Sequence, residues 1–317
     1  MTPKSSFMHP IRLLCLVCLV PLSVWSNGPK PFPKNVHRIL FLGNSITYGG
    51  HYITDIETYL TLKYPKKSFE FINVGLPSET VSGLSEENHA GGRFPRPDLH
   101  ERLARVLAQT QPDFVFACYG MNDGIYLPLE EGRFQKFKDG ITWLHDEITQ
   151  LGVPIVHLTP PVYDESRGKD KGYAAVLDHY ADWLLQQRKI QKWEVVDIHS
   201  EMQNYLTQRR KTNPEFSFAK DGVHPDALGH WLMAKPVLAY LGQKDVQPAE
   251  TLEDAIVFHP KSKEVHKLIS QRQQLMKDAW LTSTGHKRPE MAVGLPLEEA
   301  KKKALEIEKE IRELLKK

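Results

Sequence analysis

The chain has 317 residues, of which 41% are hydrophobic and 25% charged, as expected for a globular protein large enough for one catalytic domain. Its 41 basic and 39 acidic side chains nearly balance, which argues against a nucleic-acid partner because such a partner requires clustered positive charge. The sequence has no long low-complexity tract and no solenoid-type repeat, so disordered, fibrous and repeat classes are not indicated.

The first 26 residues are typical of an export signal. Lys4 and Arg12 give a basic start with no acidic residue, and residues 13–25 form an uncharged, mostly apolar run. That run is shorter than the roughly 20 apolar residues that span a membrane. We therefore expect residues 1–26 to be removed and the mature chain to be exported, to the periplasm or beyond the cell, without a transmembrane segment. An uncleaved anchor or a disordered start is the alternative.

Two of the 3 cysteines lie within this signal, so the mature chain would keep Cys118 alone. A single thiol forms no internal disulfide, so the stability of the fold must come from a large core. Because Cys118 lies in an apolar run, we expect a buried packing residue and not a nucleophile. The sequence has no CxxC or HExxH spacing, so neither a structural zinc site nor a zinc-protease site is indicated.

After a Pro-rich lead over residues 27–36, short apolar runs bounded by Gly or Pro alternate with helix-length stretches. Such runs indicate strands buried on both faces, and the alternation predicts an α/β fold with a parallel sheet. Right-handed crossovers favour a flavodoxin-like doubly wound sheet of about five parallel strands over residues 37–245. The expected strands are 39–42, 69–74, 114–119, 154–158 and 194–198, and the expected helices are about 51–64, 98–110, 132–151, 171–190 and 226–242.

Residues 246–317 differ in character and are expected to form a C-terminal helical extension. Over residues 297–314, apolar side chains recur at steps of three and four, and acidic and basic residues pair across one turn. This pattern predicts an amphipathic helix. Its regular repeat covers fewer than three heptads, which favours docking onto the body over a coiled coil. Residues 285–289 are expected to form a solvated turn between helices.

Chemically useful residues follow several of the predicted strands. Ligands of an open α/β sheet bind beyond the carboxyl ends of its strands. These ends and the final loop deliver a serine, two candidate oxyanion donors and an Asp–His pair: Ser45, Gly75, Asn122, Asp221 and His224. A serine hydroxyl becomes a nucleophile when an adjacent base takes its proton, which an imidazole oriented by a carboxylate can do. The backbone N–H groups of Ser45 and Gly75 and the amide of Asn122 could bind the oxyanion.

Each of these residues also has an ordinary structural interpretation. Ser45 could cap the helix that follows its strand, Gly75 could be a turn glycine, and Asn122 lies in a common turn composition. Asp221 and His224 could belong to a surface loop. Their coincidence at the strand ends and in the final loop, in a compatible order, favours the enzyme.

Four segments resemble the four sequence blocks of the SGNH hydrolase superfamily, the GDSL-type esterases and lipases. They are Phe41-Leu42-Gly43-Asn44-Ser45-Ile46-Thr47, Asn73-Val74-Gly75, Gly120-Met121-Asn122-Asp123 and Asp221-Gly222-Val223-His224-Pro225. The resemblance covers roughly residues 37–243. It implies a Ser45 nucleophile, a His224 base, Asp221 as third triad member, and an oxyanion hole completed by Gly75 and Asn122. It also implies that no metal or organic cofactor is needed.

Two positions depart from the pattern of this superfamily. Asn44 stands where the GDSL name has Asp; its amide keeps the capacity for hydrogen bonding and loses a charge. Ser78 stands where the second block often has Gly, which bears on the shape of the local loop.

Export and the lack of a broad apolar lid-like run favour a polar ester, and we expect an O-acetylated carbohydrate as substrate. A lysophospholipase or lipase, a thioesterase, and a non-catalytic glycan-binding protein are the alternatives. Tyr126, Tyr163 and Trp231 could stack on sugars, although packing is the simpler expectation for each. A metal site built from His199, His224 and His230 matches no ligand spacing and is disfavoured.

Overall fold

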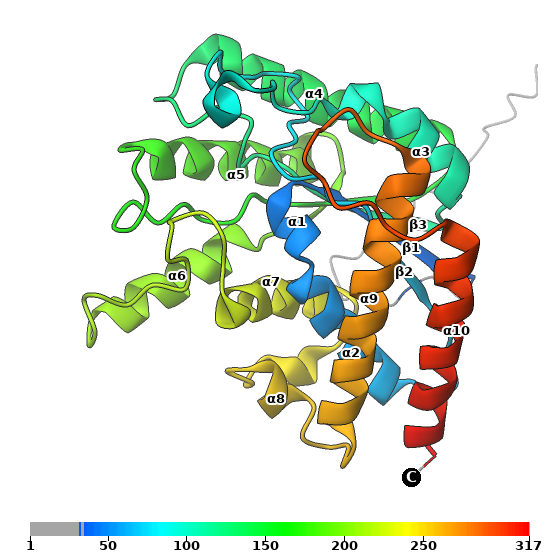
Figure 1. Cartoon of the computed structure of the whole chain (residues 1–317). Helices are drawn as coiled ribbons and strands as arrows, with labels where there is room; N and C mark the ends of the chain where they lie inside the picture. The colour runs from blue at the N-terminus through cyan, green and yellow to red at the C-terminus, as the bar shows by residue number, and fades with distance from the viewer. Residues whose placement is uncertain (1–31, 33–34, 317) are drawn as a thin grey trace, which may run out of the picture.

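The computed structural model of the chain describes residues 32 and 35–316 (Figure 1). The predicted export signal, residues 1–26, lies outside the described residues, as does most of the Pro-rich lead. Among the helices of the described part, none combines the length and the apolar character needed to cross a membrane.

Five parallel strands form a single sheet with the order β2-β1-β3-β4-β5. This is the predicted flavodoxin-like order, with all five strands where the sequence placed them. The strands are β1 (Arg38–Gly43), β2 (Glu70–Asn73), β3 (Phe114–Cys118), β4 (Ile155–Leu158) and β5 (Glu194–Val196). Parallel register stacks the Phe41 ring on Phe71 and Phe116 of the neighbouring strands, with ring centroids 5.9 and 5.1 Å away. These buried rings form the centre of one layer of the core.

Helices cover both faces of the sheet (Figure 1). One face carries α2 (His51–Lys63) and α7 (Ala227–Tyr240), which contact each other. The other carries α3 (Leu103–Thr110), α4 (Glu131–Gln150) and α5 (Tyr173–Ile190). The other elements of the body are α1 (Ser45–Gly49), α6 (His199–Arg210), α8 (Leu252–Ala255) and the 3-10 turns η1 (His89–Gly92), η2 (Leu99–Glu101) and η3 (Lys244–Val246). The sequence patterns did not predict α6.

The C-terminal extension packs on the body through two long helices, α9 (Ser262–Thr284) and α10 (Leu297–Leu314). In Figure 1, α9 lies against α2, and α10 runs alongside α9. The sequence pattern gave bounds for α10, whereas α9 was expected only as an unlocated helical part of residues 246–317. Together the two helices cover the edge of the sheet that is formed by β2.

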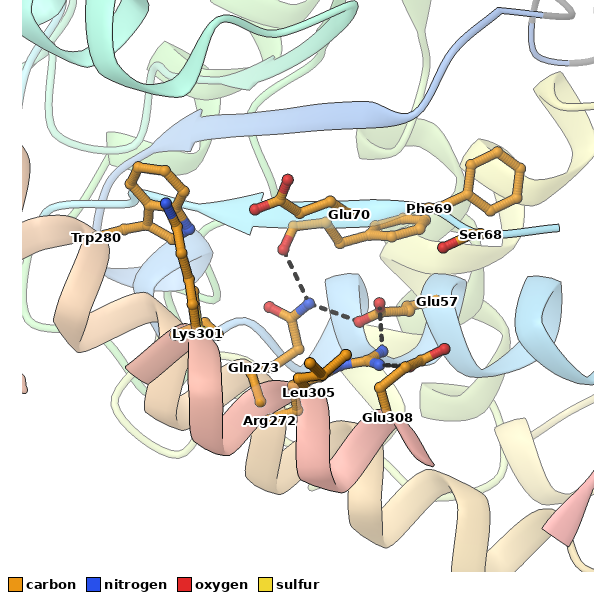
Figure 2. Close-up of a pocket in the computed structure, with 13 residues that line it drawn as sticks. Glu57, Ser68, Phe69, Glu70, Arg272, Gln273, Trp280, Lys301, Leu305 and Glu308 are labelled. Atoms are coloured by element: carbon orange, nitrogen blue, oxygen red, sulfur yellow. Dashed lines mark hydrogen bonds and ion pairs between the residues drawn. The ribbon is translucent and has the colours of Figure 1, made fainter. Parts of the chain in front are cut away.

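Polar contacts join this extension to the edge strand β2, as Figure 2 shows. The Gln273 amide donates to the backbone oxygen of Phe71 in β2 (3.1 Å) and to the buried carboxylate of Glu57. Arg272 pairs with Glu57 (2.8 Å) and with Glu308 of α10. An edge strand exposes unpaired backbone groups, and α9 supplies one of the missing partners here.

Candidate active site

Ser45 is the first residue of α1 and lies directly beyond the carboxyl end of β1. The residue that caps this helix is Asn44, whose side-chain oxygen accepts a hydrogen bond from the N–H of Ile46 at 3.2 Å. Asn44, which stands where the GDSL name has Asp, thus uses the hydrogen-bonding capacity that its amide was expected to keep. Because Asn44 satisfies the helix terminus, the Ser45 hydroxyl is available for another partner.

That partner is His224, which lies 179 positions further along the chain. The Ser45 hydroxyl oxygen lies 2.8 Å from Nε2 of His224, and Nδ1 of the same ring lies 2.7 Å from the Asp221 carboxylate. The structure therefore joins the three predicted residues in one continuous chain of hydrogen bonds. Such a chain allows an imidazole to accept the serine proton while the carboxylate orients the ring.

The Asp221–His224 loop holds its own carboxylate in place. Asp221 accepts hydrogen bonds from the backbone N–H groups of Val223 (2.9 Å) and His224 (2.8 Å). Partial burial acts to raise the pKa of Asp221, but these bonds and the His224 side chain outweigh it, and the pKa lies below its ordinary value. The carboxylate therefore stays ionised and can orient the ring.

Both residues lie at an open rim. The side chains of His224 and Asp221 are 52% and 56% exposed, whereas Ser45 is partly buried. An ester group presented on a large molecule could reach this hydroxyl without entering a deep tunnel.

Asp164 anchors the loop that carries Asp221 and His224. Its backbone N–H donates to the carbonyl of Gly222 (2.9 Å), and its buried carboxylate accepts from Arg210 (2.7 Å) and Ser217 (2.6 Å). Burial alone would raise the pKa of Asp164, but Arg210 and the neighbouring hydroxyls lower it below its ordinary value.

This anchor gives an acid-sensitive contribution to stability. Because the folded-state pKa of Asp164 is the lower one, its ionisation stabilises the fold above the unfolded-state pKa of about 3.9. That stabilisation is lost as the pH falls through the folded-state pKa. We expect Asp164→Asn to lower the free energy of unfolding at pH 7 by about 2–3 kcal/mol and to flatten its decline below pH 4. Urea unfolding between pH 3 and 7 measures both effects.

The matched control is Asp182→Asn, which changes an exposed carboxylate on α5. It is expected to alter the free energy of unfolding by less than about 0.5 kcal/mol. An Asp164→Asn profile parallel to that of the wild type below pH 4 would contradict the assignment.

Gly75 does not offer the free N–H that the sequence prediction required. Its N–H donates to the side-chain oxygen of Asn73 at 2.9 Å, within the buried part of the site. The Asn73 amide in turn donates to the carbonyl of Thr47 in α1 (2.7 Å). A Cβ at Gly75 would lie 2.4 Å from the backbone nitrogen of Tyr48, so glycine is required here for close packing against α1.

Ser78, three residues after Gly75 in the same loop, is the better candidate for a backbone oxyanion donor. Its backbone φ is +68°, in the left-handed region that non-glycine residues seldom adopt. Across the described part of the chain, neither the N–H of Ser78 nor that of Ser45 donates to another residue. These two N–H groups are therefore open to an external acceptor. The sequence pattern indicated Gly75 instead; the position at which the family often has Gly was the signal that could have indicated Ser78.

Asn122, the third predicted donor, is buried and held at both ends of its amide. Its nitrogen donates to the carbonyl of Glu79 (3.1 Å), and its oxygen accepts from the Tyr126 hydroxyl (3.1 Å). These contacts fix the orientation of the amide and leave one N–H for a further acceptor. The neighbouring Asp123 carboxylate accepts from the N–H groups of Val81, Ser82 and Gly120 (2.8–2.9 Å), which ties this turn to the loop after β2.

Comparison with known families decides the identity of this arrangement. A model of the GDSL-like lipase/acylhydrolase family matches residues 41–232. The chain belongs to this family. The match begins at the first residue of the Ser45 segment and ends beyond His224, and it confirms both the resemblance seen in the sequence and the assignment as a hydrolase.

Solved structures share the fold of this GDSL-like hydrolase. The acetylxylan esterase Axe2 from Geobacillus stearothermophilus is 22% identical, with a TM-score of 0.51 over 65% of this chain and 94% of that one. LAE5, an α/β hydrolase from the metagenome of Lake Arreo, is 21% identical, with a TM-score of 0.51 and coverages of 65% and 95%. The gut microbial diltiazem-metabolizing enzyme BT4096 is 23% identical, with a TM-score of 0.52. The alignment covers 67% of this chain and only 48% of BT4096. Comparison with curated proteins gives no match.

A buried ion pair supports the loop of the hydrolase that carries Ser78. Arg102 binds both carboxylate oxygens of Glu79 (2.6 and 2.8 Å), and its side chain is 1% exposed. The Tyr119 hydroxyl donates to the same carboxylate at 2.7 Å. Glu79 is the residue after Ser78, and its backbone carbonyl accepts a hydrogen bond from Asn122. The buried ion pair, which holds Glu79 in place, therefore supports both the Ser78 and the Asn122 side of the candidate oxyanion hole.

The remaining candidate residues have structural roles. Trp231 and Tyr163 are buried and therefore cannot stack on a sugar, whereas the partly buried Tyr126 orients Asn122. Burial raises the pKa of the Cys118 thiol to about 12, which confirms a packing residue. His199 binds Asp178 (2.8 Å). No group of three or more His, Cys, Asp or Glu side chains in the described residues could hold a metal ion.

Proposed function

We propose that this family member is a serine esterase that hydrolyses carboxylic esters through an acyl-enzyme intermediate. The observation that carries the proposal is the hydrogen-bonded chain from Ser45 through His224 to Asp221, with contacts of 2.8 and 2.7 Å. The residues come from the end of a strand and from a distant loop. Only the fold brings them together.

In the proposed mechanism, His224 takes the hydroxyl proton of Ser45 as its oxygen attacks the ester carbonyl. Asp221 stabilises the imidazolium that forms. The N–H groups of Ser45 and Ser78 and the Asn122 amide bind the negative oxygen of the tetrahedral intermediate, with Ser78 replacing the predicted Gly75. His224 then protonates the leaving alcohol, and a water molecule activated by the same ring releases the acid.

We propose short acyl esters of carbohydrates, acetyl esters above all, as the substrates. The open rim at His224 supports this proposal, since an acetyl group on a bulky glycan can approach it. A structure with the same fold is described as an acetylxylan esterase, and a variant of it as an acetyl-xylooligosaccharide esterase. We also propose, from residues 1–26 of the sequence, that the mature enzyme is exported.

Two measurements test this substrate class. We expect acetate release from acetylated xylooligosaccharides, and a kcat/KM for nitrophenyl acetate at least about tenfold above that for nitrophenyl octanoate. The physical reason is that a solvent-exposed site has little apolar surface to bind a long chain, which gains about 0.8 kcal/mol for each buried methylene. A preference for octanoate would overturn the carbohydrate proposal in favour of a lipase or lysophospholipase, and a higher rate with acyl thioesters would favour a thioesterase.

A further inference from the structure

The loop between α9 and α10, outside the region matched by the family model, reaches the active site. It is the long orange-to-red connection in Figure 1. Its Arg288 donates from Nε to the backbone oxygen of Pro77 at 3.0 Å. The prediction of a solvated turn over residues 285–289 was therefore wrong for Arg288, which is partly buried against the loop that carries Ser78.

The acceptor of this bond belongs to a functionally important peptide unit. The carbonyl of Pro77 and the N–H of Ser78 are the two ends of one planar peptide group. That peptide is trans, so its C=O and N–H point in opposite directions. Because Arg288 binds the carbonyl of Pro77, the N–H of Ser78 points away from Arg288.

We propose that Arg288 is a positioning residue for the oxyanion hole, acting through the Pro77–Ser78 peptide. This proposal rests on the function proposed above. Rotation of the peptide plane would turn the Ser78 N–H away from the site, and the bond to Arg288 opposes that rotation. A cation on the carbonyl oxygen also polarises the peptide and makes its N–H a stronger donor. The left-handed φ of Ser78 makes an external restraint useful here.

Arg288 is itself held in place by several contacts. Its guanidinium lies 5.2 Å from the centroid of the Phe94 ring and donates to the carbonyl of Pro289 at 2.9 Å. The chain is tied to the body on both sides of Arg288, by Arg105 binding the carbonyl of Thr284 (3.1 Å) and by Arg93 pairing with Glu290. These contacts place Arg288 before any substrate binds.

The test is steady-state hydrolysis of nitrophenyl acetate by the full-length Arg288→Ala protein. We expect kcat to fall about tenfold with KM unchanged within twofold, a smaller loss than removal of a complete oxyanion donor causes. The kcat of Arg288→Lys, which keeps one charged donor, should lie between that of Arg288→Ala and that of the wild type. Added methylguanidinium should partly restore the kcat of Arg288→Ala, which would not occur if the substitution acted only by unfolding.

Arg312→Ala is the matched control. Arg312 also binds backbone carbonyls of the body from the extension, those of Pro65 and Lys67, but it does so before β2, at the opposite end of the sheet. Its kcat should equal that of the wild type.

A second readout is the affinity for a phenylboronic acid, which forms a tetrahedral adduct with the serine. It should weaken in Arg288→Ala and in Asn122→Ala, but not in Arg312→Ala. Wild-type kcat in Arg288→Ala, with Ser45→Ala inactive, would overturn the role of Arg288 and leave the proposed esterase standing. Full activity in Ser45→Ala would overturn the proposed function itself.

Discussion

Replacement of Ser45 by alanine is expected to lower kcat for ester hydrolysis by about 10⁴- to 10⁶-fold. The substitution removes the only hydroxyl within 2.8 Å of Nε2 of His224 in the described structure, and with it the site of acylation. The oxyanion donors remain and account for the residual rate. The fold should persist, because Asn44 and not Ser45 caps α1. Nitrophenyl acetate hydrolysis at substrate saturation measures the loss.

Ser200→Ala provides the control, because Ser200 is an exposed serine near the start of α6. Its kcat should match that of the wild type. A Ser45→Ala protein that is folded and retains more than about 1% of the wild-type kcat would remove Ser45 from the mechanism.

Loss of Arg102 is expected to have the largest effect on stability. In Arg102→Ala the free energy of unfolding should fall by about 3–5 kcal/mol, because the substitution leaves the carboxylate of Glu79 buried without its counter-ion. Both side chains are almost fully buried, at 1% and 0% exposure. The bond from Arg102 to the carbonyl of Val74 (2.8 Å) is lost as well. Urea unfolding followed by tryptophan fluorescence measures the change.

Arg105, in the first turn of the helix α3 that follows Arg102, offers a comparison. Its ion pair with Glu101 is partly solvent-exposed, at 44% and 22%, and such pairs contribute little. With its bond to the carbonyl of Thr284, Arg105→Ala should cost about 1 kcal/mol. Equal unfolding midpoints for Arg102→Ala and Arg105→Ala would show that the Glu79 pair does not stabilise the fold.

The sheet and the Ser45–His224–Asp221 arrangement were predictable because each depends on a strong local pattern combined with a general rule. Apolar runs that end at Gly or Pro identified the strands. The convergence of strand ends in a parallel sheet then implied that Ser45 and Asn122 lie on one edge. The three-residue spacing of Asp221 and His224 lets one short loop present both groups, and in the structure Nδ1 of His224 lies 2.7 Å from the Asp221 carboxylate.

The oxyanion donor after β2 could not be predicted in the same way. Which N–H points outward depends on the backbone angles of Ser78 and on the side chain of Asn73, which occupies the N–H of Gly75. A serine does not itself indicate a left-handed φ, and the only sign of it was that the family often has Gly at this position. The pattern of apolar positions likewise does not predict hydrogen bonds made by side chains, such as that between Asn73 and the N–H of Gly75.

The bounds of helix α9 could not be predicted for a related reason, although residues 246–317 were expected to be helical. Its inward face includes Gln273 and Lys277, which are only 9% and 5% exposed and interrupt the apolar stripe. They are buried because they bind groups of the body, the carbonyls of Phe71 and Tyr48. A helix that docks through polar contacts lacks the hydrophobic period that identified residues 297–314. In α6, only His199, Met202 and Leu206 are buried, so its stripe is weak.

The cover that α9 gives to β2 has a consequence for any shortened form of the enzyme. A chain ended at residue 245 would lose the helix that binds the carbonyl of Phe71. The exposed edge strand β2 could then pair with β2 of another molecule, which is a route to self-association. The C-terminal extension thus covers the edge strand. We expect an enzyme shortened to residues 1–245 to be less soluble and to lose the restraint that Arg288 places on the oxyanion hole.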